Sequence, residues 1–286
     1  MAFITEKDRA FFRENGYLLV KGVVPKENCD RVIDAIWDCL DTDRSNPDNW
    51  YKPPKGVLSG GGMVEMYHHQ TMWDNRQHPN VHQAFAELLG EEKLWVSLDR
   101  VNMKPPVREA HRELDYSFIH WDTDTSKLPE FPLPHPYGLQ GVLYLADTAT
   151  NQGGFQCVPG IYRNLEAYLK AQPADRNPTV PDLTGYEVEA IPGEAGDLLI
   201  WDVLLPHGNG RNFAETPRYA QYITMFKVNP SRLENVQARI DCWENRKGPS
   251  GPAFPGDPRN WEQNTFEGPP ELTPLGRKLL GLDSWE

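Results

Sequence analysis

Cysteine is scarce in this chain of 286 residues, which has four of them, at Cys29, Cys39, Cys157 and Cys242. No two of them form a Cys-x-x-Cys pair, and this spacing argues against a zinc knuckle or a redox dithiol. An isolated cysteine usually behaves as a small hydrophobic group in a protein interior. We therefore expect buried free thiols.

The sequence also has no long apolar run. A membrane-spanning helix needs about 18 or more consecutive apolar residues, and no such stretch is present. The N-terminal segment, residues 1–9, is charged and lacks the apolar core of a signal peptide. These features predict a protein that does not cross a membrane and that resides in the cytoplasm.

Positive charge is in deficit as well, because 29 Lys and Arg residues face 41 Asp and Glu residues, for a net charge of −12. Nucleic-acid-binding proteins need a basic surface to neutralise phosphates. The composition therefore argues against a nucleic-acid partner. The oligomeric state is left open.

The first third of the chain, about residues 1–93, is predicted to be a helical flank. Thr5 can cap a short helix that runs to Asn15, and Asp8 stands close to the capping-box spacing. Apolar residues recur at helical spacing again over residues 26–40.

The chain changes character at about residue 94, where short β-prone runs separated by turn residues begin. These runs cover residues 94–103, 116–121, 139–145, 154–158, 186–191, 197–201 and 219–228. Seven or more short strands after a helical section predict a mainly β sandwich or small barrel with flanking helices. We expect one domain over residues 1–286, with its β core at about 94–230 and a polar C-terminal extension at about 231–286.

The most informative motif is His120-Trp121-Asp122. If residues 116–121 form a strand, side chains two apart share a face, so His120 and Asp122 would project together. Two histidines and one carboxylate form the usual ligand set of non-haem Fe(II) oxygenases. His207, which follows a predicted strand, is the candidate for the second histidine.

Polar residues on neighbouring strands are candidates for binding a cosubstrate. Arg218 starts an apolar, alternating strand, where its charge would face the interior, and arginine suits two-pronged binding of a carboxylate. The alternative is a salt bridge to Asp202 or Glu215. Asn102 and Gln140 lie on strands expected near the site and could bind a cosubstrate or the substrate, or could equally be hydrogen-bonded barrel interior.

Several short motifs occur in one order along residues 5–230. They are the segment 11–20, His120-x-Asp122, Asn151-Gln152-Gly153-Gly154 with Val158-Pro159-Gly160, Gly196-Asp197, His207 and Arg218. This ordered set resembles the phytanoyl-CoA dioxygenase family of Fe(II)/2-oxoglutarate-dependent oxygenases.

The resemblance implies a double-stranded β-helix (a jelly roll, cupin-like) and an Fe(II) ion held by His120, Asp122 and His207. It also implies 2-oxoglutarate as cosubstrate, with Arg218 pairing its distal carboxylate, and dioxygen in an open position. The implied reaction is hydroxylation of an unactivated C–H bond in a small organic molecule, with succinate and CO2 as co-products.

Two features of the chain bear on the substrate and the reaction. Family members commonly carry Pro-Gly-Ser-His where this chain has Pro159-Gly160-Ile161-Tyr162, which leaves open whether the substrate is a free acid, an acyl thioester or another metabolite. The carboxylate of Asp122 argues against a halogenase. Desaturation or another oxidation in place of hydroxylation is left open.

Two rival functions remain. One is a cupin-like isomerase or hydrolase that uses a metal without 2-oxoglutarate, which would not need Arg218. The other is a catalytically silent binding protein on the same fold, which the intact metal triad argues against.

The expected rim of the pocket consists of residues 56–67 and 104–116. Arg108, Arg112 and Lys127 are candidates for holding an anionic substrate group. Apolar surface for the substrate is expected from Met63, Met66, Trp73, Phe118 and Phe131.

Overall fold

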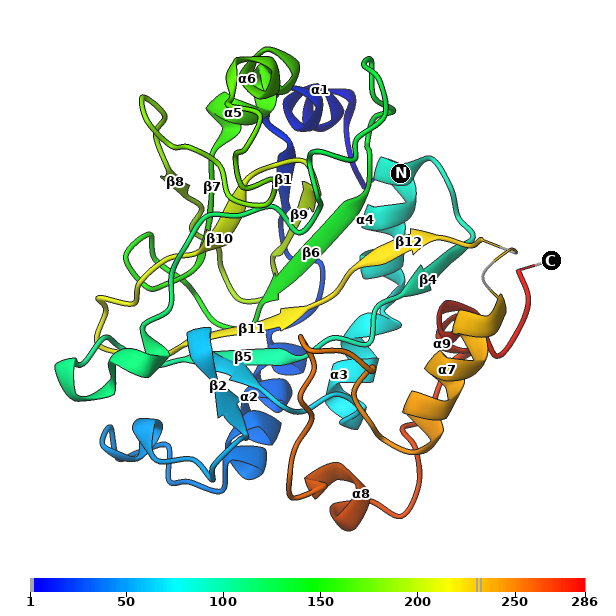
Figure 1. Ribbon diagram of the computed structural model, residues 1–286. Helices are drawn as coiled ribbons and strands as arrows, with labels where there is room; N and C mark the ends of the chain where they lie inside the picture. The colour runs from blue at the N-terminus through cyan, green and yellow to red at the C-terminus, as the bar shows by residue number, and fades with distance from the viewer. Residues whose placement is uncertain (1–2, 230, 232, 286) are drawn as a thin grey trace.

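The computed structural model describes residues 3–229, 231 and 233–285. Its largest sheet is antiparallel and has seven strands (Figure 1). In spatial order these are β1 (Tyr17–Val20), β9 (Leu198–Asp202), β6 (Leu139–Tyr144), β11 (Arg218–Tyr222), β5 (Val101–Lys104), β3 (Met63–Val64) and β2 (Leu58–Ser59).

A second sheet contains β10 (His207–Asn209), β7 (Phe155–Cys157) and β8 (Glu189–Ala190), and a two-stranded sheet pairs β12 (Met225–Lys227) with β4 (Leu94–Val96). The three-stranded sheet packs against one face of the large sheet, because Phe155 and Cys157 share a hydrophobic core with Leu199 and Trp201 of β9. The fold is thus mainly β, a double-stranded β-helix with flanking helices, as the sequence predicted.

The other face of the large sheet carries the main core. Leu198 and Ile200 belong to this core while Leu199 and Trp201 face the opposite way, which is the alternation expected of a strand buried on both sides. Side chains of α2 (Lys26–Leu40) and α4 (Pro79–Leu89) fill the core from outside the sheet. None of the described helices combines the length and the apolar composition that crossing a bilayer requires.

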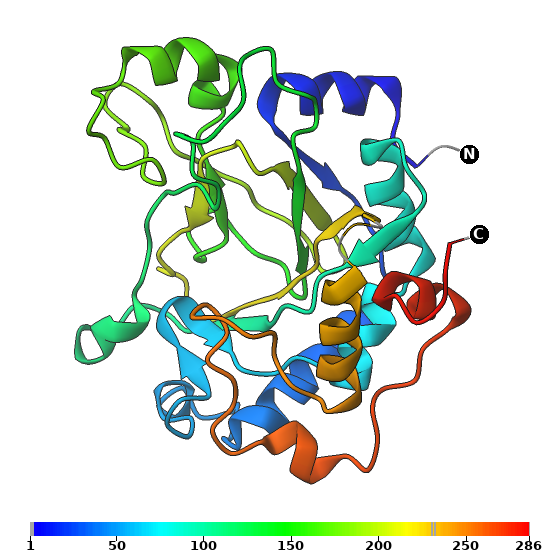
Figure 2. The same ribbon diagram turned by 45° about the vertical axis from the view of Figure 1, so that its right-hand side comes forward.

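Helices predicted from local signals are present. In α1 (Glu6–Asn15) the Thr5 side chain accepts from the Asp8 amide and Asp8 accepts from the Thr5 amide, which forms the expected capping box. Helices that the sequence did not reveal are α3 (Gln70–Arg76), α5 (Pro159–Arg163), α7 (Leu233–Glu244) and α8 (Trp261–Thr265). Figures 1 and 2 show α7 beside α9 (Pro274–Leu280), with α8 below them at the bottom of the molecule.

Three predicted strands were wrong in extent. Residues 94–103 divide into β4 and β5, and residues 219–228 divide into β11 and β12. The two breaks lie side by side, because Ser97 and Thr224 exchange hydrogen bonds there. At each break the chain passes between the two-stranded sheet and the large sheet. Residues 186–191 contribute only β8.

The strand predicted at residues 116–121 was also wrong. The structure describes all six residues, and they form a loop that meets β10 at a single bridge, between His120 and His207. A strand needs a continuous partner, and the amide next in line, that of Trp121, instead donates to Thr179 O at 2.9 Å.

Candidate metal centre

Three predicted ligands come together at one end of the sheets. His120 Nε2 lies 3.2 Å from Asp122 Oδ1, and His207 Nε2 lies 3.5 Å from Asp122 Oδ2. One ligand atom from each residue lies within 4.8 Å of the others, so the three could hold a metal ion. We call His120, Asp122 and His207 the triad.

The convergence predicted for the triad is present, but the reason given for it was not correct. His120 and His207 exchange two main-chain hydrogen bonds, of 2.9 and 3.0 Å, and this bridge holds the two imidazoles side by side. Asp122 then reaches them from the turn that follows His120. The pairing of a loop with β10, and not the alternation along a strand, therefore builds the site.

The orientation of His207 suits a metal ligand. Its Nδ1 lies 2.9 Å from the Leu205 carbonyl oxygen, which can only accept a hydrogen bond. Nδ1 therefore carries the proton and Nε2 presents a lone pair towards Asp122. A lone pair that faces a carboxylate needs a cation between them, and a divalent metal satisfies this donor set.

Asp122 is held as an ionised carboxylate. Burial alone would raise its pKa, but the neighbouring imidazoles of His120 and His207 and the amide of Gln140 bring the pKa well below its ordinary value. Gln140 Nε2 donates to Asp122 Oδ2 at 2.6 Å, and Trp201 Nε1 donates to Gln140 Oε1 at 3.0 Å. Trp201 thereby fixes which end of the Gln140 amide faces the triad.

Arg218 lies fully buried at the start of β11, as the sequence predicted for a charge facing the interior. Its Nη1 donates to Asn102 Oδ1 at 2.9 Å and lies 3.4 Å from the Tyr222 hydroxyl. Its Nε and Nη2 have no hydrogen-bond partner among the described residues. A buried guanidinium with two free donors fits a carboxylate that the protein itself does not supply.

The alternative salt bridges of Arg218 are not formed within the described part of the chain. Asp202 accepts instead from the amides of Tyr137 and Leu204, at 2.9 and 3.0 Å. Glu215 is exposed.

Lys104 is a second buried cation close to Arg218, and the two residues are paired across β5 and β11. Its Nζ donates to the carbonyl oxygens of Tyr116, at 2.8 Å, and Gly210, at 2.6 Å. Burial, together with the charge of Arg218, lowers the pKa of Lys104 to about 8.

A cavity of about 670 Å3 opens onto the triad. Its wall includes Gln140, Tyr222 and the aromatic side chains of Tyr116 and Phe118, whereas Arg218, which contacts Tyr222, is not part of the lining. Of the expected rim, residues 59–61, Met63 and Tyr116 contribute.

Other parts of the expected pocket lie elsewhere. Arg108, Arg112 and Lys127 form surface ion pairs with Asp48, Glu109 and Asp124, respectively, because they stand on exposed turns of the loops. Trp73 and Met66 are fully buried in the main core, and Phe131 packs in a separate apolar cluster. These six side chains do not belong to the cavity lining.

Sequence reasoning missed several lining residues. Asp99 and Arg100, in the link between β4 and β5, contribute to the wall, and so do Pro252 and Ala253 of the C-terminal extension. No local signal marks them, because their place in the wall depends on contacts with residues far away in the chain.

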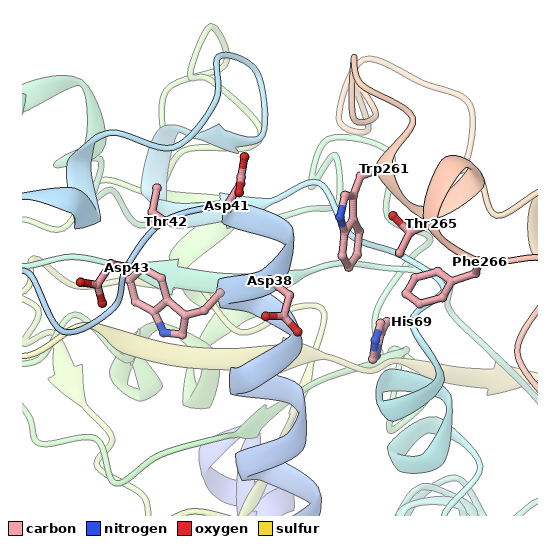
Figure 3. Close-up of a pocket in the computed structure, with 9 residues that line it drawn as sticks. Asp38, Asp41, Thr42, Asp43, His69, Trp261, Thr265 and Phe266 are labelled. Atoms are coloured by element: carbon pink, nitrogen blue, oxygen red, sulfur yellow. The ribbon is translucent and has the colours of Figure 1, made fainter.

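A second cavity, of about 580 Å3, lies between the C-terminal end of α2 and α8 (Figure 3). Asp38, Asp41 and Asp43 line one part of it, and Trp261 and Phe266 line another. Among the described residues, the triad is the one set of three metal-ligating groups that converges. The first cavity is therefore the candidate site.

Comparisons with known proteins agree with this geometry. The chain matches the profile of the family phytanoyl-CoA dioxygenase (PhyH) over residues 12–220. A Dictyostelium discoideum protein named "Putative phytanoyl-CoA dioxygenase" is 23% identical over 277 residues, with 80% of this chain and 78% of that protein covered.

Two solved structures share the fold. The hypothetical Escherichia coli protein JW0805 superposes with a TM-score of 0.71 at 18% identity, covering 98% of this chain and 82% of its own. The epimerase SnoN, in complex with Fe3+, α-ketoglutarate and nogalamycin RO, gives a TM-score of 0.58 at 19% identity, covering 94% and 96%. With the profile match spanning well over half of its length, the chain belongs to the phytanoyl-CoA dioxygenase family and is an enzyme of the iron- and 2-oxoglutarate-dependent oxygenase kind.

Proposed function

We propose that this chain is an Fe(II)- and 2-oxoglutarate-dependent dioxygenase that hydroxylates an unactivated C–H bond of a small organic molecule, releasing succinate and CO2. The observation that carries the proposal is the convergence of three ligand atoms from His120, Asp122 and His207 within 4.8 Å beside a cavity. Iron bound there supplies the activation of dioxygen, which protein side chains cannot perform alone.

In this proposal Arg218 binds the distal carboxylate of 2-oxoglutarate. The support is its pair of free, buried donors, Nε and Nη2. SnoN, which shares the fold, has been crystallised with α-ketoglutarate and iron, and this agrees with the same pair of ligands here.

Asn102 and Gln140, predicted from the sequence to contact the cosubstrate or substrate, are assigned positioning roles in the proposal. Asn102 orients Arg218 through its Oδ1, while its Nδ2 donates to Gly61 O at 2.8 Å. Gln140 orients the carboxylate of Asp122. Removing a contact that orients a metal ligand, such as that of Gln140, typically changes metal affinity or activity by about 10–100-fold.

The test is an anaerobic spectroscopic titration of the apo protein with Fe(II) and then with 2-oxoglutarate. A weak visible charge-transfer band that needs both components is expected, because 2-oxoglutarate would chelate the bound metal. His120→Ala or Asp122→Ala is expected to abolish Fe(II) binding and the band. Succinate release then serves to screen substrates.

Other outcomes would favour the rivals. Fe(II) binding without a band would point to a cupin-like isomerase or hydrolase, and no metal binding would point to a silent binding protein. Organisation of residues 1–286 as one domain remains a prediction, which limited proteolysis can test.

A further inference from the structure

Two charged side chains, Asp99 and Arg100, line the cavity beside the triad, and Glu65 pairs with Arg100 from outside the lining. We call Glu65, Asp99 and Arg100 the Arg100 cluster. Arg100 Nη1 donates to Glu65 Oε1 at 2.7 Å, and the Phe254 ring covers the guanidinium at 4.8 Å. Because Glu65 is fully buried, it serves as the permanent counter-ion of Arg100. Arg100, itself only 9% exposed, is therefore already neutralised by the protein.

Asp99 is the exposed member of the cluster, with 31% of its side chain accessible. Its Oδ1 accepts from the Arg100 amide at 2.7 Å and lies 3.6 Å from Arg100 Nε. Its Oδ2 has no hydrogen-bond donor among the described residues, and Arg76 binds the Asp99 main-chain carbonyl instead of the carboxylate. The cavity wall thus offers one free anionic acceptor.

The pKa of Asp99 agrees with a carboxylate that lacks a cationic partner at its free oxygen. Burial raises its pKa above the ordinary value, and the charges of Arg100 and Arg76 offset this effect only in part. A cation that bound the free oxygen would stabilise the ionised carboxylate further.

Part of the wall near the triad is aromatic. The Phe118 ring, 39% exposed, stacks on His120 with 4.4 Å between ring centroids, and Tyr116, 56% exposed, meets Phe118 edge-on at 5.0 Å. Met63 lines the same cavity. Large exposed aromatic side chains at a cavity wall are suited to an apolar substrate body.

We propose that Asp99 binds an ammonium group of the substrate, so that the substrate is an amine with an apolar or aromatic body and not an acyl-coenzyme A thioester. This inference rests on the proposed function, because it takes the cavity beside the triad as the active site. A charge-assisted hydrogen bond to Asp99 would anchor the ammonium group, and Tyr116 and Phe118 would contact the body.

Two further observations favour a cation over an anion. The phosphates of coenzyme A need unpaired cations, whereas Arg100, the one Lys or Arg among the described residues of the lining, is paired with Glu65. The net charge of −12 also attracts cationic ligands towards the protein and repels anionic ones.

The test compares three probes of one shape with different charge: 3-phenylpropylamine, 3-phenylpropanol and 3-phenylpropanoate, together with octanoyl-coenzyme A. Dissociation constants are measured by calorimetry and ligand-observed NMR on the full chain, with and without Fe(II) and 2-oxoglutarate under anaerobic conditions. The amine is expected to bind at least about tenfold more tightly than the alcohol, which corresponds to about 1.4 kcal/mol.

Asp99→Asn is expected to remove this preference, since Asn keeps the acceptor for the Arg100 amide but loses the charge. Asp175→Asn, the same change at an exposed residue, is the matched control and is expected to keep the preference. Thermal unfolding checks that each variant is folded, and Asp99→Ala replaces Asp99→Asn if the latter is not.

The inference would be overturned by tighter binding of the carboxylate or the coenzyme A thioester, or by an unchanged preference for the amine in the folded Asp99 variant. Failure of the proposed function is separate. It would appear as a missing charge-transfer band in the wild-type protein, whatever the probe affinities measured without iron.

Discussion

Two buried arginines near the site, Arg218 and Arg100, differ in how their charge is balanced. Arg100 has the carboxylate of Glu65 at 2.7 Å, whereas Arg218 has a neutral amide and a phenol, and two of its nitrogens have no partner among the described residues. A buried charge is costly unless it is paired. The protein thus neutralises Arg100 with its own carboxylate, whereas Arg218 is left for the carboxylate of a ligand.

The largest expected effect is a loss of unfolding free energy when Arg100 loses its counter-ion, Glu65. Glu65→Ala leaves the Arg100 guanidinium buried without a counter-ion and removes the acceptor for Tyr67 and for the Gly256 amide. Breaking one side of a buried ion pair typically costs about 3–5 kcal/mol of unfolding free energy. Urea unfolding of the apo protein measures this, and a loss under about 1 kcal/mol would contradict the pairing argument.

The second largest expected effect is a loss of 2-oxoglutarate affinity when Arg218 is replaced. Arg218→Gln is expected to raise the dissociation constant of 2-oxoglutarate about 30–100-fold, or about 2–3 kcal/mol, because hydrogen bonds to a charged group are lost. Fe(II) affinity is expected to stay unchanged, and calorimetry on the same samples tests this. Arg100→Gln is the matched variant, and an equal loss of 2-oxoglutarate affinity in it would remove the distinction between the two arginines.

A third change makes Arg218 resemble Arg100. Asn102→Asp places a carboxylate where Nη1 of Arg218 now meets the amide oxygen at 2.9 Å. The internal carboxylate is expected to compete with 2-oxoglutarate and to weaken its binding about tenfold. Asn102→Ala, which removes the contact without adding charge, should have a smaller effect. If the two variants weaken binding equally, competition by charge is not the cause.

The smallest expected effect is a change of 2-oxoglutarate affinity with pH. The pKa of Lys104 is about 8, lowered by burial and by Arg218. Its protonated form adds positive charge near the proposed carboxylate site, so 2-oxoglutarate affinity should fall, by about threefold, as the pH rises from 7 to 9. Titrations at fixed ionic strength measure this, and Lys104→Met should flatten the profile. An unchanged slope in Lys104→Met would assign the pH dependence to another group.

Local sequence signals predicted the elements whose boundaries are set locally. The capping box at Thr5 and the glycine after Asn15 defined α1, and helical periodicity defined α2, because these interactions lie within a few residues. Helices α3 and α7 carried no such signal. Trp73 of α3 is fully buried by contacts with distant parts of the chain, which a local pattern does not reveal.

The sequence predicted which residues form the site but not the backbone arrangement that brings them together. His120, Asp122 and His207 converge as expected, although residues 116–121 form no strand and one bridge to His207 brings the ligands together. Asn102 and Gln140 lie near the site as expected, but their polar atoms bind Arg218 and Asp122. Whether either touches a ligand directly remains a prediction.

The sequence by itself determined which chemical groups are available: two imidazoles and a carboxylate for a metal, and an arginine for a second carboxylate. It also determined their order, and this order identifies the family. Only the tertiary structure decided that Arg218 has no counter-ion among the described residues while Arg100 has one, and that Asp99 and the C-terminal extension reach the same cavity. The physical reason is that side-chain chemistry belongs to each residue, whereas charge balance depends on distances between residues that only strand pairing and packing bring together.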